Sequence, residues 1–144
     1  MSRGTIIGLL CSVGLIFVRP TSAEEKLQFN RDVRPILADN CFKCHGPDAK
    51  ARKAKLRLDL PEGAAKDLGG YRAVEPGKPD ESEMIVRITS HDPDDLMPPP
   101  KSKKTLTPKQ IEILRKWITE GAEYERHWSF VKPKRSEPPR ASDH

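Results

Sequence analysis

"CFKCHGPD", residues 41–48, is the short stretch of this sequence on which the fold depends. Two cysteines stand three positions apart, and His45 directly follows the second of them. Because cysteine and histidine are rare, a chance match to this pattern is expected in on the order of one chain in a thousand of this length. The pattern therefore indicates a function, and it is compatible with a dithiol redox pair, part of a zinc site, a disulfide or a covalent haem attachment.

The first three alternatives find little support elsewhere in the sequence. A dithiol oxidoreductase places its cysteines in a βαβ context, which the flanking residues do not offer. A zinc site needs further ligands, but Cys11 lies in a segment that we expect to be removed, and His91 and His127 have no partner at metal-ligand spacing. A disulfide between Cys41 and Cys44 would close a loop too small to stabilise the chain much.

Covalent haem attachment uses all three residues of the motif. The thiols of Cys41 and Cys44 would add to the porphyrin vinyl groups as thioethers, and His45 would lie under the ring and bind the iron. The composition agrees, because a chain with 6% aromatic residues, 33% charged residues and fourteen prolines builds only a thin core unaided. We therefore predict one covalent haem c, which would supply the missing apolar mass.

A haem iron that carries electrons without admitting substrates needs a sixth ligand. Met97 is the preferred candidate, because the prolines of "DLMPPP" (95–100) would hold its thioether in a fixed position. Met84 is a rival, although its place on the apolar side of a predicted helix favours a role in the core. His91 is a second rival and would give a lower reduction potential than methionine.

The N-terminus has the features of a secretory signal peptide. Arg3 precedes an apolar run over residues 6–18, and small residues stand at Thr21 and Ala23. We expect cleavage after Ala23 and a mature protein in the periplasm or on the outer face of the cytoplasmic membrane. The alternative is an uncleaved anchor, the only case in which contact with a membrane is expected. Export agrees with haem attachment, which takes place outside the cytoplasm.

The charge of the mature chain is mild. Removing Arg3 and Arg19 with the signal leaves 24 basic and 21 acidic residues, a net charge of +3. The basic runs at 101–104 and 132–135 are not interleaved with aromatic residues, so we expect solvated loops rather than a nucleic-acid surface. Such loops could still steer an acidic redox partner.

Three short helices are expected from the apolar spacing. The first covers 32–40, with Pro35 in its first turn. The second begins at Asp80, with Glu83 as the partner in a capping box, and buries Met84, Ile85 and Ile88. The third covers 108–120, between the capping pair Thr107 and Gln110 and a stop at Gly121, with an apolar face made by Ile111, Leu114, Trp117 and Ile118. "LRLDL" (56–60) could be a short strand or an extended segment.

Taken in order, these elements resemble the planctomycete-type cytochrome c domain. The likeness is carried by "FNRDVRPILADNCFKCHG", "LRLDLPEGA", "VEPGKPDESEMIVRI" and "LMPPPKSKKTLTPKQIEILRKWITEGA", and it covers about residues 28–124. By that resemblance Cys41 and Cys44 attach the haem, His45 is the proximal iron ligand and Met97 the distal one. The match to the cysteine motif is more specific than the match to Met97.

The resemblance implies an all-α, class I-like cytochrome c fold with long irregular loops around one haem. In such a fold the first and last helices, here 32–40 and 108–120, cross at a haem edge, with Phe29, Leu37, Leu114 and Trp117 expected there. The domain would occupy residues 24–124. The tail, 125–144, is expected to be disordered and resembles a junction to downstream domains, where Trp128 and Phe130 would be exposed or fold back.

The function expected from these features is one-electron transfer rather than enzymatic catalysis. The iron would cycle between Fe(III) and Fe(II), either in a free carrier or in a relay domain, and the chain shows no convincing arrangement of nucleophile and base. Redox proteins are the expected partners, and a monomer is expected. Two alternatives remain: an open haem that acts on peroxide or binds gases, and a recruiting module of a larger exported assembly.

Overall fold

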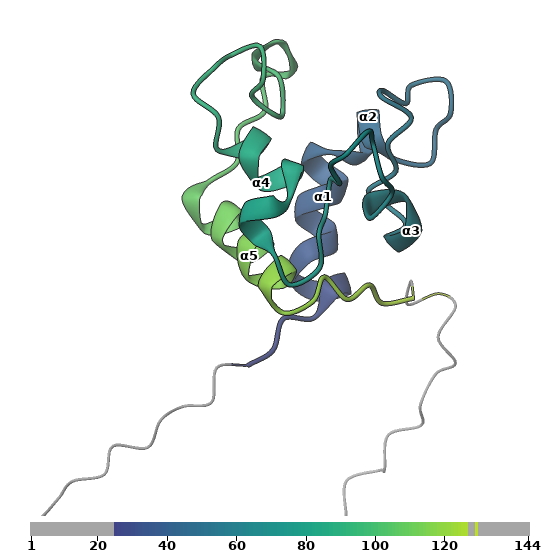
Figure 1. Cartoon of the computed structure of the whole chain (residues 1–144), viewed down its shortest axis with the longest axis vertical. Helices are drawn as coiled ribbons and strands as arrows, with labels where there is room; N and C mark the ends of the chain where they lie inside the picture. The colour runs from purple at the N-terminus through teal and green to yellow at the C-terminus, as the bar shows by residue number, and fades with distance from the viewer. Residues whose placement is uncertain (1–24, 127–128, 130–144) are drawn as a thin grey trace, which may run out of the picture.

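A computed structural model describes residues 25–126 and residue 129 of the 144-residue chain (Figure 1). The predicted signal peptide and the pair Trp128 and Phe130 lie outside the described residues, as does His127. None of the described helices is long and apolar enough to cross a bilayer.

Short helices joined by long loops make up the described part of the chain. In chain order they are η1 (Phe29–Val33, a π-helical turn), α1 (Arg34–Asn40), α2 (Phe42–His45), α3 (Pro61–Ala64), η2 (Pro79–Glu81, a 3₁₀ turn), α4 (Glu83–Ile88), η3 (Pro100–Ser102, a 3₁₀ turn) and α5 (Pro108–Thr119). Residues 25–126 contain no sheet, only isolated bridges that Arg72 makes with Asp67 and Ser82. The all-α prediction is confirmed, and "LRLDL" (56–60) forms no strand.

The two long loops project from the same end of the molecule. One follows α2 and leads to α3, and the other joins α4 to α5 (Figure 1). Both α2 and the loop that carries Met97 therefore lie at this end, beyond the packed helices α1, α4 and α5.

The first helix starts earlier than its apolar spacing predicts. The π-helical turn η1 begins at Phe29 and runs directly into α1, where Pro35 lies in the first turn as expected. Proline is tolerated there because the first helical N–H groups have no intrahelical partner. The helix ends where the backbone N–H of Cys41 donates to the carbonyl oxygen of Leu37, at 2.8 Å.

The predicted cap of the second helix is wrong. Asp80 lies in η2, and Ser82 precedes the first residue of α4 without making a side-chain cap. The Ser82 hydroxyl is fully buried and accepts a hydrogen bond from the backbone N–H of Glu75, whereas Asp80 forms an ion pair with Arg115 on α5. The predicted apolar face of α4 is confirmed, since three side chains are buried: Met84, Ile85 and Ile88.

The predicted ends of the last helix are confirmed. The hydroxyl of Thr107 accepts from the backbone N–H of Gln110 at 3.2 Å, and the Gln110 side chain accepts from the backbone N–H of Thr107 at 2.9 Å. Past the helix Gly121 has a φ of +102°, the left-handed conformation that glycine adopts most readily.

One apolar core joins the two ends of the described chain. The rings of Phe29 and Trp117 lie 5.7 Å apart, and Leu37 and Leu114 are completely buried in the same cluster. The expected contact between the first and last helices is therefore present, although it is the turn η1 rather than α1 that packs most closely on α5.

Candidate cofactor site

The cysteine motif forms a single helical turn that follows directly from α1. Cys41 stands between the two helices, and the backbone N–H groups of Cys44 and His45 donate to its carbonyl oxygen at 3.0 and 2.8 Å. The three side chains that would hold a haem therefore come from one turn, which the backbone hydrogen bond from Cys41 to Leu37 joins to α1.

The residue after the motif has room for no side chain. A Cβ added at Gly46 would lie 2.3 Å from the backbone oxygen of Phe42, far inside van der Waals contact. The buried Gly46 lets the chain turn back over α2, where Arg52 donates to the carbonyl oxygens of Gly46 and Pro47 at 3.0 and 2.7 Å. Sequence reasoning did not single out Gly46, although its place directly after His45 was a signal for a tight turn.

The following loop satisfies the carbonyl groups of the motif. The backbone N–H of Lys53 donates to the oxygen of Cys44, and the backbone N–H of Leu58 donates to the oxygen of His45, both at 2.8 Å. A four-residue helix has no carbonyl partners of its own at its end. The loop thus supplies those partners and fixes the backbone of Cys44 and His45.

The thiols are free, and one of them is hard to ionise. Cys41 and Cys44 are both free and half-buried, and burial raises the pKa of Cys41 to about 11, which the positive charge of Lys104 only partly opposes. Dithiol oxidoreductases lower the pKa of the attacking cysteine, because the thiolate is the nucleophile. The surroundings of Cys41 therefore disfavour the dithiol redox interpretation.

The His45 imidazole is in the form that binds metals. Burial lowers its pKa, opposed by a weaker effect of the Lys53 backbone, so the ring is neutral at pH 7. Its Nδ1 atom is buried and has no hydrogen-bond partner among the described residues. A buried polar atom without a partner is costly, so the ring is suited to contacts that the polypeptide alone does not provide. Two thiols and a neutral imidazole on one turn fit the donor set of a haem c.

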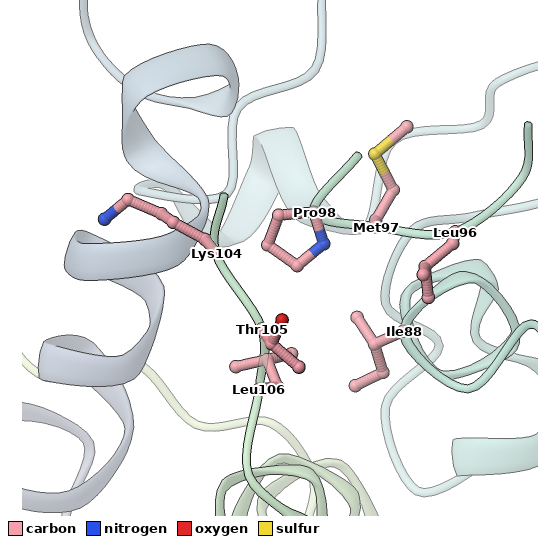
Figure 2. Close-up of a pocket in the computed structure, with 7 residues that line it drawn as sticks. All are labelled: Ile88, Leu96, Met97, Pro98, Lys104, Thr105 and Leu106. Carbon is pink, nitrogen blue, oxygen red and sulfur yellow. The ribbon is translucent and has the colours of Figure 1, made fainter. Parts of the chain in front are cut away.

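Met97 lies in the loop between α4 and α5 that reaches the same end of the molecule. Its backbone N–H donates to the carbonyl oxygen of Arg87 at 3.0 Å, and its half-buried side chain packs on the core. Figure 2 shows this side chain extending away from Ile88 and Leu106, beside a cavity of about 60 Å³. The cavity is lined by Ile88, Leu96, Met97, Pro98, Lys104, Thr105 and Leu106.

A long-range hydrogen bond ties this loop to the cysteine motif. The ammonium group of Lys104 donates to the backbone oxygen of Asp39 near the end of α1, two residues before Cys41. The residues after Met97 are thereby held against the helix that leads into the motif. No local pattern indicates this contact, because 65 positions separate the two residues.

The rival ligands lie in less suitable places. Met84 is only 7% exposed within the core, on the buried face of α4, whereas His91 is exposed in the loop after that helix. Within the part of the chain that the structure describes, no three His, Cys, Asp or Glu side chains are grouped in a way that could hold a metal ion. The zinc alternative therefore gains no support from these residues.

Comparison with known families places part of this chain in a described family. Residues 41–101 match the family described as Planctomycete cytochrome C. Searches of curated proteins and of solved structures found no match to this chain. The matched range starts at Cys41 and includes Cys44, His45 and Met97.

Proposed function

We propose, from the premise that residues 41–101 are a planctomycete cytochrome c domain, that this protein is an exported c-type cytochrome that transfers single electrons. The observation that carries the proposal is the one-turn arrangement of Cys41, Cys44 and a neutral His45, whose Nδ1 atom has no hydrogen-bond partner among the described residues. A cytochrome c domain implies a haem protein, and when bound the haem would supply an iron that cycles between Fe(III) and Fe(II).

Each residue of the motif has a separate task in this proposal. The sulfur atoms of Cys41 and Cys44 would hold one haem c as thioethers, and the imidazole of His45 would be the proximal iron ligand. The backbone N–H groups of Lys53 and Leu58, which donate to the carbonyl oxygens of Cys44 and His45, would hold the backbone of this turn in place.

Met97 is proposed as the distal ligand. Its loop is held at one end by the bond to Arg87 and at the other by the contact between Lys104 and Asp39. A thioether in this position would leave no iron site for substrates, and electron transfer itself requires no acid, base or nucleophile among the side chains. The partners would be redox proteins outside the cytoplasm, met by a monomeric carrier or relay domain.

The proposal is tested by the intact mass of the denatured mature protein, produced in a periplasm that has cytochrome c maturation machinery. We expect a mass increased by one haem and the loss of this increase when Cys41 and Cys44 are both changed to Ala. His91→Ala is the matched control, since His91 is exposed and should leave the haem mass unchanged. A bare polypeptide mass for the unaltered chain would refute covalent haem attachment.

A further inference from the structure

Three aromatic rings gather where the two ends of the described chain meet. The ring of Tyr124 lies 4.5 Å from that of Phe29 and 5.2 Å from that of Trp117, measured between centroids. Rings at these separations and tilts attract each other beyond the effect of burial alone. Tyr124 therefore has a defined position, although it lies in an extended segment after α5.

The backbone around Tyr124 is fixed as well. Ala122 adopts a φ of +51° as its N–H donates to the carbonyl oxygen of Trp117, and the Trp117 indole N–H donates to the carbonyl oxygen of Glu123 at 3.0 Å. The backbone oxygen of Arg126, two residues after Tyr124, accepts a hydrogen bond from the Asn30 side chain at 2.8 Å. The segment is held before Tyr124 by Trp117 of the core and after it by Asn30 of η1.

From this position Tyr124 reaches the loop that supports the cysteine motif. Its hydroxyl donates to the backbone oxygen of Leu58 at 3.1 Å, and the backbone N–H of Leu58 donates to the oxygen of His45 at 2.8 Å. Leu58 is only 4% exposed, and the bond that it accepts from Tyr124 is partly buried. The two bonds use adjacent peptide groups of one buried residue, and they connect the aromatic cluster to the backbone of His45.

We propose that Tyr124 is a positioning residue that orients the His45 imidazole through Leu58. The inference rests on the proposed function, in which His45 is a haem ligand. Tyr124 lies outside the matched range 41–101, so the family match does not assign it a role. A ligand ring keeps its orientation toward the iron only if its backbone is held, and supporting contacts of this kind tune a metal centre without touching it.

The test is Tyr124→Phe in the haem-loaded protein, which removes the hydroxyl and keeps the ring. We expect a shift of the haem midpoint potential and of the ferric EPR g values, together with about tenfold faster hydrogen exchange of the Leu58 amide, as loss of one buried bond predicts. Tyr71→Phe is the matched control, because the chain has only these two tyrosines and Tyr71 is 46% exposed.

A second control separates positioning from general loss of stability. Thr107→Ala removes the cap of α5 far from Leu58 in the sequence and should leave the potential and the EPR spectrum unchanged. Asn30→Ala removes the side-chain bond to Arg126 and keeps the backbone bond to Glu125, and it should give a smaller shift of the same sign as Tyr124→Phe.

Two results would overturn the inference, and they differ from each other. If Tyr124→Phe and Asn30→Ala keep the potential and the EPR spectrum of the unaltered protein, Tyr124 has only a structural role. If the unaltered protein carries no haem, the proposed function fails and the inference fails with it. The haem content of the unaltered protein, measured first, distinguishes these cases.

Discussion

A single methyl group at Gly46 should disrupt the turn that carries the cysteine motif. Gly46→Ala would place a Cβ 2.3 Å from the backbone oxygen of Phe42 and 3.0 Å from its carbonyl carbon. Ordinary contacts begin at 3.4 Å, so α2 and the chain after it would have to separate by about 1 Å. The obstructing atoms belong to the backbone and cannot rotate away.

The cost of this separation can be estimated. Gly46 has a φ of −126°, which any residue can adopt, so the penalty is a steric collision rather than backbone strain. Overpacking by one carbon in a buried position costs about 1–3 kcal/mol, and a rigid backbone neighbour favours the upper end of that range. Since each kcal/mol lowers the Tm of a domain of this size by roughly 4–8 °C, we expect a decrease of roughly 12–24 °C.

The assay is thermal unfolding of the haem-loaded protein, followed by circular dichroism, with haem content measured by intact mass. Gly70→Ala is the control, because its Cβ would meet nothing within 4 Å although its φ is +95°. The free energy of unfolding of that variant should fall only by the conformational cost of alanine in the left-handed region, about 1–2 kcal/mol. The variant should keep its haem. An equal Tm and equal haem content for Gly46→Ala and the unaltered protein would refute the close approach of Gly46 to Phe42.

Three further predictions concern the ligands, the thiol and a helix cap. Met97→Leu should convert the ferric haem from low spin to high spin. Met84→Leu should keep the haem low-spin and lower the free energy of unfolding by less than about 1.5 kcal/mol. A low-spin haem in the Met97→Leu variant would exclude Met97 as the distal ligand. The pKa of the Cys41 thiol rises from 9.0 to about 11 on folding, so its stabilisation of the haem-free protein is present below pH 9 and is lost as the pH rises toward 11. Urea titrations should show this loss, at most about 3 kcal/mol, in the haem-free protein but in neither Cys41→Ala nor the thioether-linked form. Thr107→Ala should lower the free energy of unfolding by about 1 kcal/mol through loss of the α5 cap, and an unchanged urea midpoint would contradict the capping geometry.

Local signals accounted for the last helix of the fold. Thr107, Pro108 and Gln110 form the start of α5, and Gly121 follows its end, each within one turn of the residues that it affects. Capping depends on side chains and backbone groups three positions apart, so it can be recognised from the order of residues alone.

The start of α4 shows where such signals fail. Asp80 and Glu83 have capping-box spacing, but the chain forms the 3₁₀ turn η2 instead, and the Ser82 hydroxyl binds the backbone N–H of Glu75, seven positions earlier. Asp80 forms an ion pair with Arg115, which is 35 positions away. The partners that decide this helix start come from tertiary contacts, which local spacing does not reveal.

The candidate site likewise combines residues that can be recognised from the sequence with supporting contacts that cannot. Cys41, Cys44 and His45 stand together in the sequence, and their chemistry is recognisable from residue type and spacing. The residues that hold the backbone of the motif are not recognisable in this way. Leu58 is a buried apolar residue that acts through its backbone N–H and oxygen, and any residue other than proline supplies those atoms. The composition of a segment therefore does not disclose which backbone groups hold a ligand.

The contacts around the cysteine motif indicate how much of the chain is needed to hold a haem. The family match covers 41–101, yet the core against which the motif rests is completed by Phe29 on one side of that range and by Leu114 and Trp117 on the other. Without α5, which packs on α4, apolar surface of α4 would be exposed to water, at a cost of about 25 cal/mol for each Å². Tyr124, 23 positions beyond the matched range, connects that core to the backbone next to His45 through Leu58. The smallest unit expected to hold the haem in a fixed geometry therefore includes η1 and the segment after α5, and a fragment limited to the matched range should be unable to do so.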